Sequence, residues 1–114
     1  MLSRRARENP TSYVNTVTPR YVRQLIARLP DGPDKTALVN ALDKRTTEEL
    51  TYFREVIQTY LRTHGPMSRK SLYYELIFAC PPGSEEYAEE AIDQLLVERV
   101  IGLINDDLIM KTDF

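Results

Sequence analysis

Five acidic side chains lie close together near the C-terminal end of the chain. They are Glu85, Glu86, Glu89, Glu90 and Asp93. Residues 84–114 carry nine acidic and two basic side chains, a net charge of −7, whereas residues 1–83 carry thirteen basic and eight acidic ones, a net charge of +5. This asymmetry predicts an acidic surface that attracts a basic partner, with a solvated face as the alternative.

Residue types that commonly carry nucleophilic or metal chemistry are scarce. The chain has one cysteine, Cys80, and one histidine, His64, which is too few for a four-ligand zinc site or an internal disulfide. Cys80 follows an apolar run and is expected to be buried, while His64 precedes Gly65-Pro66 and is expected to stabilise a helix end. The glycines are isolated, so no phosphate-binding loop is predicted. We therefore predict a non-enzymatic protein without a metal or cofactor.

Length and composition indicate a single globular domain. The chain has 114 residues, of which 42% are hydrophobic. It contains no apolar run of about 18 residues, so no membrane-spanning helix is predicted. The basic start lacks the apolar stretch of a secretory signal. We expect a soluble cytoplasmic protein that does not interact with membranes.

The N-terminal part predicts a basic arm followed by two helices. Residues 1–17 show no apolar period and are expected to form a mobile basic arm. Thr18 and Pro19 are typical of a helix start, and Pro30 should end that helix. A second helix with a narrow apolar stripe should follow the turn at residues 31–34. Residues 18–45 are therefore expected to form a helical pair.

Residues 46–114 predict three further helices and a hairpin. The pattern Thr46-Thr-Glu-Glu49 is typical of a helix start, and Gly65-Pro66 of its end. Ser68 should cap the next helix, and Ser84 a third one that carries the acidic residues. Two short apolar runs then flank a polar turn at residues 105–107, which predicts a β-hairpin. The expected fold class is mostly α, within the α+β class.

This order of elements resembles the winged helix-turn-helix superfamily. The resemblance covers residues 46–110, and the segment Ala91–Ile104 is similar to the third helix of such domains running into the first strand of the wing. It implies that residues 46–114 form a winged-helix domain whose hairpin is the wing. In this family the third helix and the wing commonly contact DNA. The matching positions here are Glu85, Glu86, Glu89, Glu90, Asp93, Asp106 and Asp107.

Carboxylates at those positions have the wrong sign for a phosphate backbone. The resemblance and the charge together favour a protein-binding module, an adaptor or a regulatory subunit, whose acidic third helix meets a basic partner. A more specific version is that the helix imitates a phosphate track and blocks a nucleic-acid-binding protein.

The alternative function is DNA binding through a different surface, in which basic side chains of the N-terminal half contact phosphates and an arm enters the minor groove. The candidate residues are Arg4, Arg5, Arg7, Arg20, Arg23, Arg28, Arg69 and Lys70. A third alternative is enzymatic, because Ser71–Glu75 resembles the tyrosine-bearing helix of the winged-helix part of type IIB topoisomerases. Packing is the preferred role for Tyr73 and Tyr74.

Homodimerisation through the first predicted helix is a further hypothesis. Its apolar stripe consists of Val22, Leu25, Ile26 and Leu29. So short a helix must bury this stripe against something. A second copy of the chain and the chain's own domain are the two alternatives.

Overall fold

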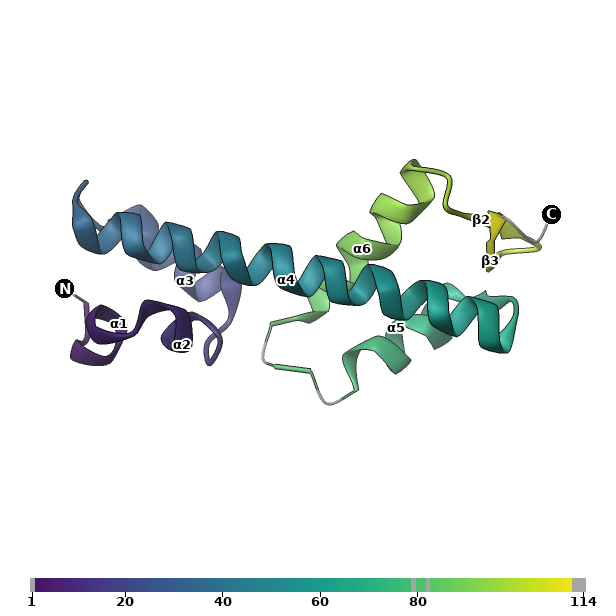
Figure 1. The fold of residues 1–114 in the computed structure, drawn as a ribbon, viewed down its shortest axis with the longest axis horizontal. Helices are drawn as coiled ribbons and strands as arrows, with labels where there is room; N and C mark the ends of the chain where they lie inside the picture. Colours follow the sequence, from purple (N-terminus) through teal and green to yellow (C-terminus); the bar gives the residue numbers. More distant parts are fainter. Residues whose placement is uncertain (1, 79, 82, 112–114) are drawn as a thin grey trace. The chain divides into compact units, whose positions relative to one another are not determined.

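The computed structural model describes residues 2–78, 80–81 and 83–111. These residues form mainly helices, with a small antiparallel sheet (Figure 1). The helices are α1 (Arg4–Glu8), α2 (Pro10–Val14), α3 (Pro19–Arg28), α4 (Pro33–His64), α5 (Arg69–Ile77) and α6 (Glu85–Val97), and the strands are β1 (Met67–Ser68), β2 (Ile101–Ile104) and β3 (Asp107–Met110). The predicted α+β class with a helical majority is confirmed.

The chain divides into two compact units. The N-terminal unit consists of Met1–Glu48 and Pro81–Ser84, and the C-terminal unit of Glu49–Cys80 and Glu85–Phe114. Helix α4 contributes residues to both units, because the division falls within it. Among the described residues, no helix combines the length and the apolar character that crossing a bilayer would need.

Helices α1 to α3 and the first part of α4 build the core of the N-terminal unit. Its buried side chains are Leu2, Ala6, Val14, Val22, Leu38, Ala41 and Leu42. The expectation of an arm without regular structure was wrong, because residues 4–8 and 10–14 are helical. Each of these short helices has a local cap: the side chains of Ser3 and Asn9 accept hydrogen bonds from the backbone amides of Ala6 and Ser12. Burial of Leu2, Ala6 and Val14 supplies the tertiary contacts that such short helices require.

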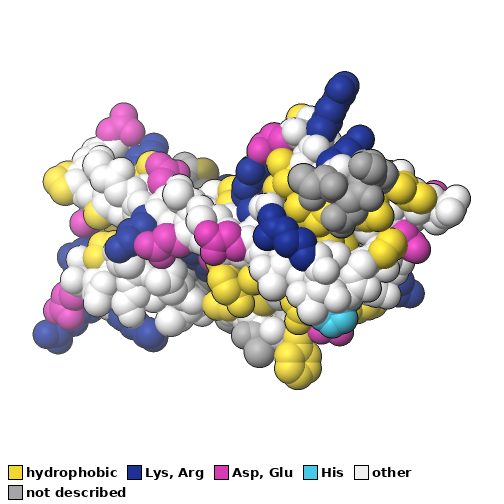
Figure 2. Space-filling view, turned by 45° about the vertical axis from the view of Figure 1, so that its right-hand side comes forward, with side chains coloured by type: hydrophobic (Ala, Val, Ile, Leu, Met, Phe, Trp, Pro, Cys, Tyr) yellow, Lys and Arg dark blue, Asp and Glu magenta, His cyan; other side chains and the backbone are white. Residues whose placement is uncertain are grey.

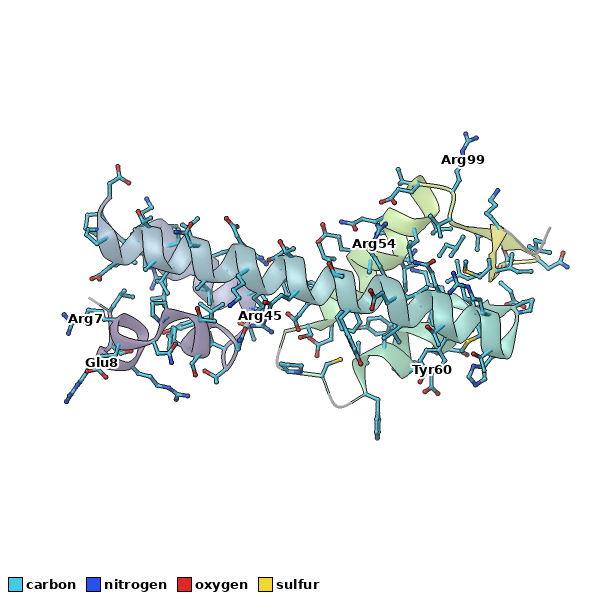
Figure 3. All side chains as sticks on the ribbon, viewed as in Figure 1. Arg7, Glu8, Arg45, Arg54, Tyr60 and Arg99 are labelled. Atoms are coloured by element: carbon cyan, nitrogen blue, oxygen red, sulfur yellow. The ribbon has the colours of Figure 1, made fainter. Side chains whose placement is uncertain are left out.

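A buried arginine fixes the segment that follows α2. Arg45, on α4, is 3% exposed, and its Nη1 donates to the carbonyl oxygens of Val14 at 2.7 Å and Val17 at 2.5 Å. Its Nη2 donates to Ser84 Oγ at 3.3 Å. Figure 3 shows the position of Arg45 on α4. The guanidinium thus supplies a donor to the last carbonyl of α2 and to a carbonyl in the segment between α2 and α3.

Helix α4 is longer than the sequence pattern indicated. The predicted second helix and the predicted helix starting at Thr46 are one continuous helix, so the expected start at Thr46 was wrong. No glycine or proline occurs between Pro33 and Gly65 to interrupt it. The buried face also continues through the expected break, from Leu42 through Arg45 to Phe53. The predicted boundary between residues 45 and 46 therefore lies inside a helix.

In the C-terminal unit, the second part of α4 packs together with α5, α6 and the three-stranded sheet. Its core includes Phe53, Ile57, Leu72, Ile92 and Leu108. The strand order is β1-β3-β2, and both pairings are antiparallel. The predicted hairpin is confirmed as β2 and β3, whereas the two-residue strand β1 was not predicted.

Local signals explain the boundaries of the hairpin and of α5. Asn105 and Asp106 have φ angles of +53° and +67°, which is the backbone of a two-residue type I′ turn that asparagine and aspartate tolerate. The predicted cap at Ser68 is confirmed, since its Oγ accepts a hydrogen bond from the Ser71 amide at 3.1 Å. Gly65 adopts a φ of +77° after α4, as its predicted role as a left-handed helix stop requires.

Two further residues have a left-handed backbone. Arg99 has a φ of +62° two residues after the end of α6, where its amide donates to the Leu96 carbonyl and the next amide, of Val100, donates to the Leu95 carbonyl. These two bonds form a Schellman motif, whose left-handed position usually holds glycine. Gly83 has a φ of +81°, and a Cβ atom there would lie 2.5 Å from Pro19 Cδ. Glycine is therefore required at position 83 by both backbone and space.

Candidate functional site

Helix α6 separates its apolar and acidic residues onto two faces. Tyr87, Ala88, Ala91, Ile92 and Leu95 are buried in the core of the C-terminal unit. The opposite face carries the predicted acidic residues, of which Glu85, Glu86, Glu90 and Asp93 are exposed and Glu89 is half-buried. No Lys, Arg or His occurs within the helix. Its outward face therefore presents carboxylates to solvent.

One arginine on α5 binds two of these carboxylates. Arg69 Nη2 lies 2.8 Å from Asp93 Oδ1 and also contacts Glu89 Oε2. The hydrogen bond to Glu89, followed by that to Asp93, raises the pKa of Arg69 above its usual value. Arg69, a candidate phosphate contact, thus neutralises part of the acidic face. Glu85, Glu86 and Glu90 are also exposed on this helix.

A second arginine–carboxylate pair was not predicted. Arg54 on α4 donates two hydrogen bonds to Glu98, at 2.6 and 2.7 Å, and one to Gln94 at 3.1 Å. The hydrogen bond from Arg54 lowers the pKa of Glu98 below the usual value of a glutamate. No local spacing connects positions 54 and 98, so only the fold could reveal this pair.

The acidic residues of the hairpin lie on a different element from those of α6. Asp106 is exposed in the turn, and Asp107 is half-buried at the start of β3, where it pairs with Ile104. The hairpin also exposes apolar area at its tip, since Leu103 is 60% exposed. The tip therefore carries acidic and apolar surface together.

The basic candidates of the N-terminal half lie on α1 and α3. Arg5, Arg7, Arg20, Arg23 and Arg28 are exposed. Arg4 pairs with Glu8 on the same helix, at 2.7 Å between Nε and Oε1, and Figure 3 labels Arg7 and Glu8 on α1. By sequence, the N-terminal unit holds nine basic and five acidic residues, a net charge of +4, and the C-terminal unit six basic and twelve acidic, a net charge of −6. The charge asymmetry thus follows the structural division of the chain.

The stripe nominated for homodimerisation packs within its own unit. Val22 is fully buried, and Leu25, Ile26 and Leu29 are partly buried against the same core. This arrangement corresponds to the second of the two alternatives for that stripe, burial against the chain's own domain.

The residues considered for nucleophilic chemistry are in unreactive surroundings. The Cys80 thiol is half-buried and donates to the Leu76 carbonyl oxygen at 2.7 Å, and burial raises its pKa. Burial, followed by the charges of Glu85 and Glu89, raises the pKa of Tyr73, which keeps its phenol protonated. Both shifts disfavour the anionic nucleophile.

In the described part of the chain, no three His, Cys, Asp or Glu side chains converge as metal ligands.

Comparisons with protein-family models, with curated proteins and with solved structures found no match.

Proposed function

We propose that the C-terminal unit is a winged-helix module, an adaptor or regulatory subunit without enzymatic activity, that binds a basic protein partner through α6. The order of α4, α5, α6 and the β2–β3 hairpin supports the winged-helix assignment, in which that hairpin is the wing. The observation that carries the proposed activity is the row of exposed carboxylates Glu85, Glu86 and Glu90 on a helix without a cationic residue. Complementary charge favours encounter with a cationic surface.

An apolar residue lies on the same face of α6. Positions 86, 90, 93 and 97 recur at helical spacing, and Val97 is 81% exposed. A partner that matches this face would carry cationic side chains around an apolar one. The apolar contact would add affinity that does not fall with salt, whereas the charged contacts weaken as ionic strength rises.

The test is capture of partners by the tagged full-length chain from a nuclease-treated cell extract. A variant with Glu85→Lys, Glu86→Lys and Glu90→Lys should lose the captured basic protein by about tenfold or more, because like charges then face each other. Glu89 is left unchanged because it binds Arg69.

The matched control reverses three exposed acidic residues of the N-terminal unit, with Asp34→Lys, Asp43→Lys and Glu48→Lys. It changes the net charge by the same amount and should retain the partner. Equal loss in both variants, or no capture of a basic protein by the unchanged chain, would reject the α6 face as the binding surface.

DNA binding through the N-terminal unit is the second candidate, favoured by the net charge of +4 on that unit. The expected signature is an affinity for duplex DNA that falls steeply with salt. Arg5→Ala with Arg7→Ala should weaken it, whereas Arg62→Ala with Arg99→Ala, two exposed arginines of the C-terminal unit, should not. Fluorescence anisotropy at several salt concentrations separates the two functions.

Cytoplasmic location and homodimerisation stay predictions.

A further inference from the structure

A shallow groove of about 380 Å³ runs along α4 in the C-terminal unit. Its lining includes Tyr52, Glu55, Val56, Tyr60 and His64, which recur at helical spacing over three turns. Tyr52 is 60% exposed, so its ring is available to a ligand. Figure 2 shows the histidine, in cyan, at the surface beside hydrophobic and acidic side chains.

Aromatic rings form the walls of the groove. The rings of Tyr60 and His64 stack with centroids 5.3 Å apart and an interplanar angle of 27°. The Tyr60 hydroxyl lies 3.5 Å from Glu75 Oε2 on α5, and His64 Nδ1 lies 3.3 Å from the Tyr60 carbonyl oxygen. These contacts hold the Tyr60 ring in place. A fixed aromatic face carries negative electrostatic potential.

The groove lining holds a carboxylate and, among the described residues, no guanidinium or ammonium group. Glu55 belongs to its lining, and Glu75 lies at the Tyr60 hydroxyl, whereas none of the described lining residues is Lys or Arg. An anion would meet carboxylates and π faces here, both unfavourable. A cation with an apolar stem would place the stem along Val56 and the charge near the rings and Glu55.

We propose that this groove binds the arginine or lysine side chain of a partner polypeptide. The groove is a separate surface from the acidic face of α6, because Arg54, which is bonded to α6, does not line the groove and lies on a different side of α4 from Tyr60 (Figure 3). The two sites are independent, so either can fail without the other.

The test is an NMR titration of the isotopically labelled full-length chain with N-acetyl-arginine methylamide. Saturable shifts should map to residues 52–64 and to Glu75. N-acetyl-citrulline methylamide has the same shape without the charge and should bind more weakly. Tyr52→Leu and Glu55→Gln should each weaken arginine binding by about two- to fivefold, the range of an exposed cation–π contact for Tyr52 and of an exposed ion pair for Glu55.

Two matched variants serve as controls, Tyr74→Leu on α5 and Asp43→Asn on α4. Tyr74 is 57% exposed, Asp43 is exposed in the N-terminal unit, and neither lines the groove, so both variants should bind arginine as the unchanged chain does. Equal binding of citrulline and arginine, or the absence of shifts at residues 52–64, would overturn the proposal. Shifts confined to residues 85–97 would also overturn it, while supporting the acidic face of α6 as a cation-binding surface.

Discussion

Arg69 on α5 binds Asp93 on α6, with 2.8 Å between Nη2 and Oδ1. The same guanidinium contacts Glu89 one turn earlier on α6. A basic and an acidic residue that the sequence assigned to competing functions therefore bind each other. The exposed charge of α6 is smaller than its composition indicates, because Arg69 neutralises part of it.

Replacing Arg69 should reduce stability by a small, salt-dependent amount. The pair is partly exposed, so Arg69→Met should cost about 0.5–1 kcal/mol at low ionic strength and less in 1 M NaCl. Urea denaturation at both salt concentrations measures this. Lys70→Met, at the exposed neighbouring position, is the control and should change the free energy of unfolding little. A salt-independent cost would instead indicate lost packing.

Acid should weaken the link between Arg54 and Glu98. The folded-state pKa of Glu98 is lowered, so its contribution to stability is present above the ordinary glutamate pKa, about 4.3, and is lost as pH falls through the folded value. A ¹³C NMR titration of the Glu98 carboxyl should give a pKa below the ordinary one. In Arg54→Met it should return to that value. An unchanged titration in the variant would show that Arg54 is not the cause.

Loss of the Arg45 guanidinium should destabilise the N-terminal unit. Arg45→Met would leave the carbonyls of Val14 and Val17 without this donor, at an expected cost of about 2–4 kcal/mol. Amide hydrogen exchange should accelerate first in α1 and α2. Lys44→Met, at an exposed position one residue earlier, should leave exchange unchanged.

Glycine should be better than arginine at position 99. The left-handed backbone of Arg99 is strained by its Cβ atom, so Arg99→Gly should raise the free energy of unfolding by about 0.5–1 kcal/mol. Arg99→Ala removes the charge but keeps the Cβ and should give little gain. Thermal denaturation of the two variants separates backbone strain from charge. Equal effects would mean that the charge, and not φ, determines stability here.

A methyl group at position 83 should not be tolerated. Gly83→Ala would place its Cβ 2.5 Å from Pro19 Cδ in a left-handed backbone, at a cost of about 2–4 kcal/mol. Gly32→Ala is the control, because no atom lies within 4 Å of its Cβ position and its φ is not left-handed. Chemical denaturation of both variants measures the difference. Similar midpoints would contradict the close approach of Gly83 to Pro19.

Elements with strong local signals were predictable from the sequence. The caps at Thr18 and Ser68, the stop at Gly65 and the Asn105-Asp106 turn depend on residues next to one another in the chain. The capping pattern at Thr46 failed because its residue types also suit a helix interior when no breaker precedes them. Burial of α4 side chains on both sides of Thr46 stabilises one continuous helix.

Contacts that depend on distant positions were not predictable. Helices α1 and α2 contain few apolar residues, and only the packing of Leu2, Ala6 and Val14 identifies them as core elements. Arginine is usually exposed, so nothing in the sequence marked Arg45 as buried. For the acidic face, the residues were identifiable, but which of them an arginine neutralises was not.

The four residues Pro81–Ser84 belong to the N-terminal unit although the chain on both sides of them belongs to the other. Neither unit is therefore a contiguous stretch of polypeptide. A gene fusion or duplication that transferred residues 49–114 alone would carry Gly83 without the proline it approaches, and one that transferred residues 1–48 would leave Arg45 without Ser84. The two units are expected to be inherited together rather than exchanged as independent domains.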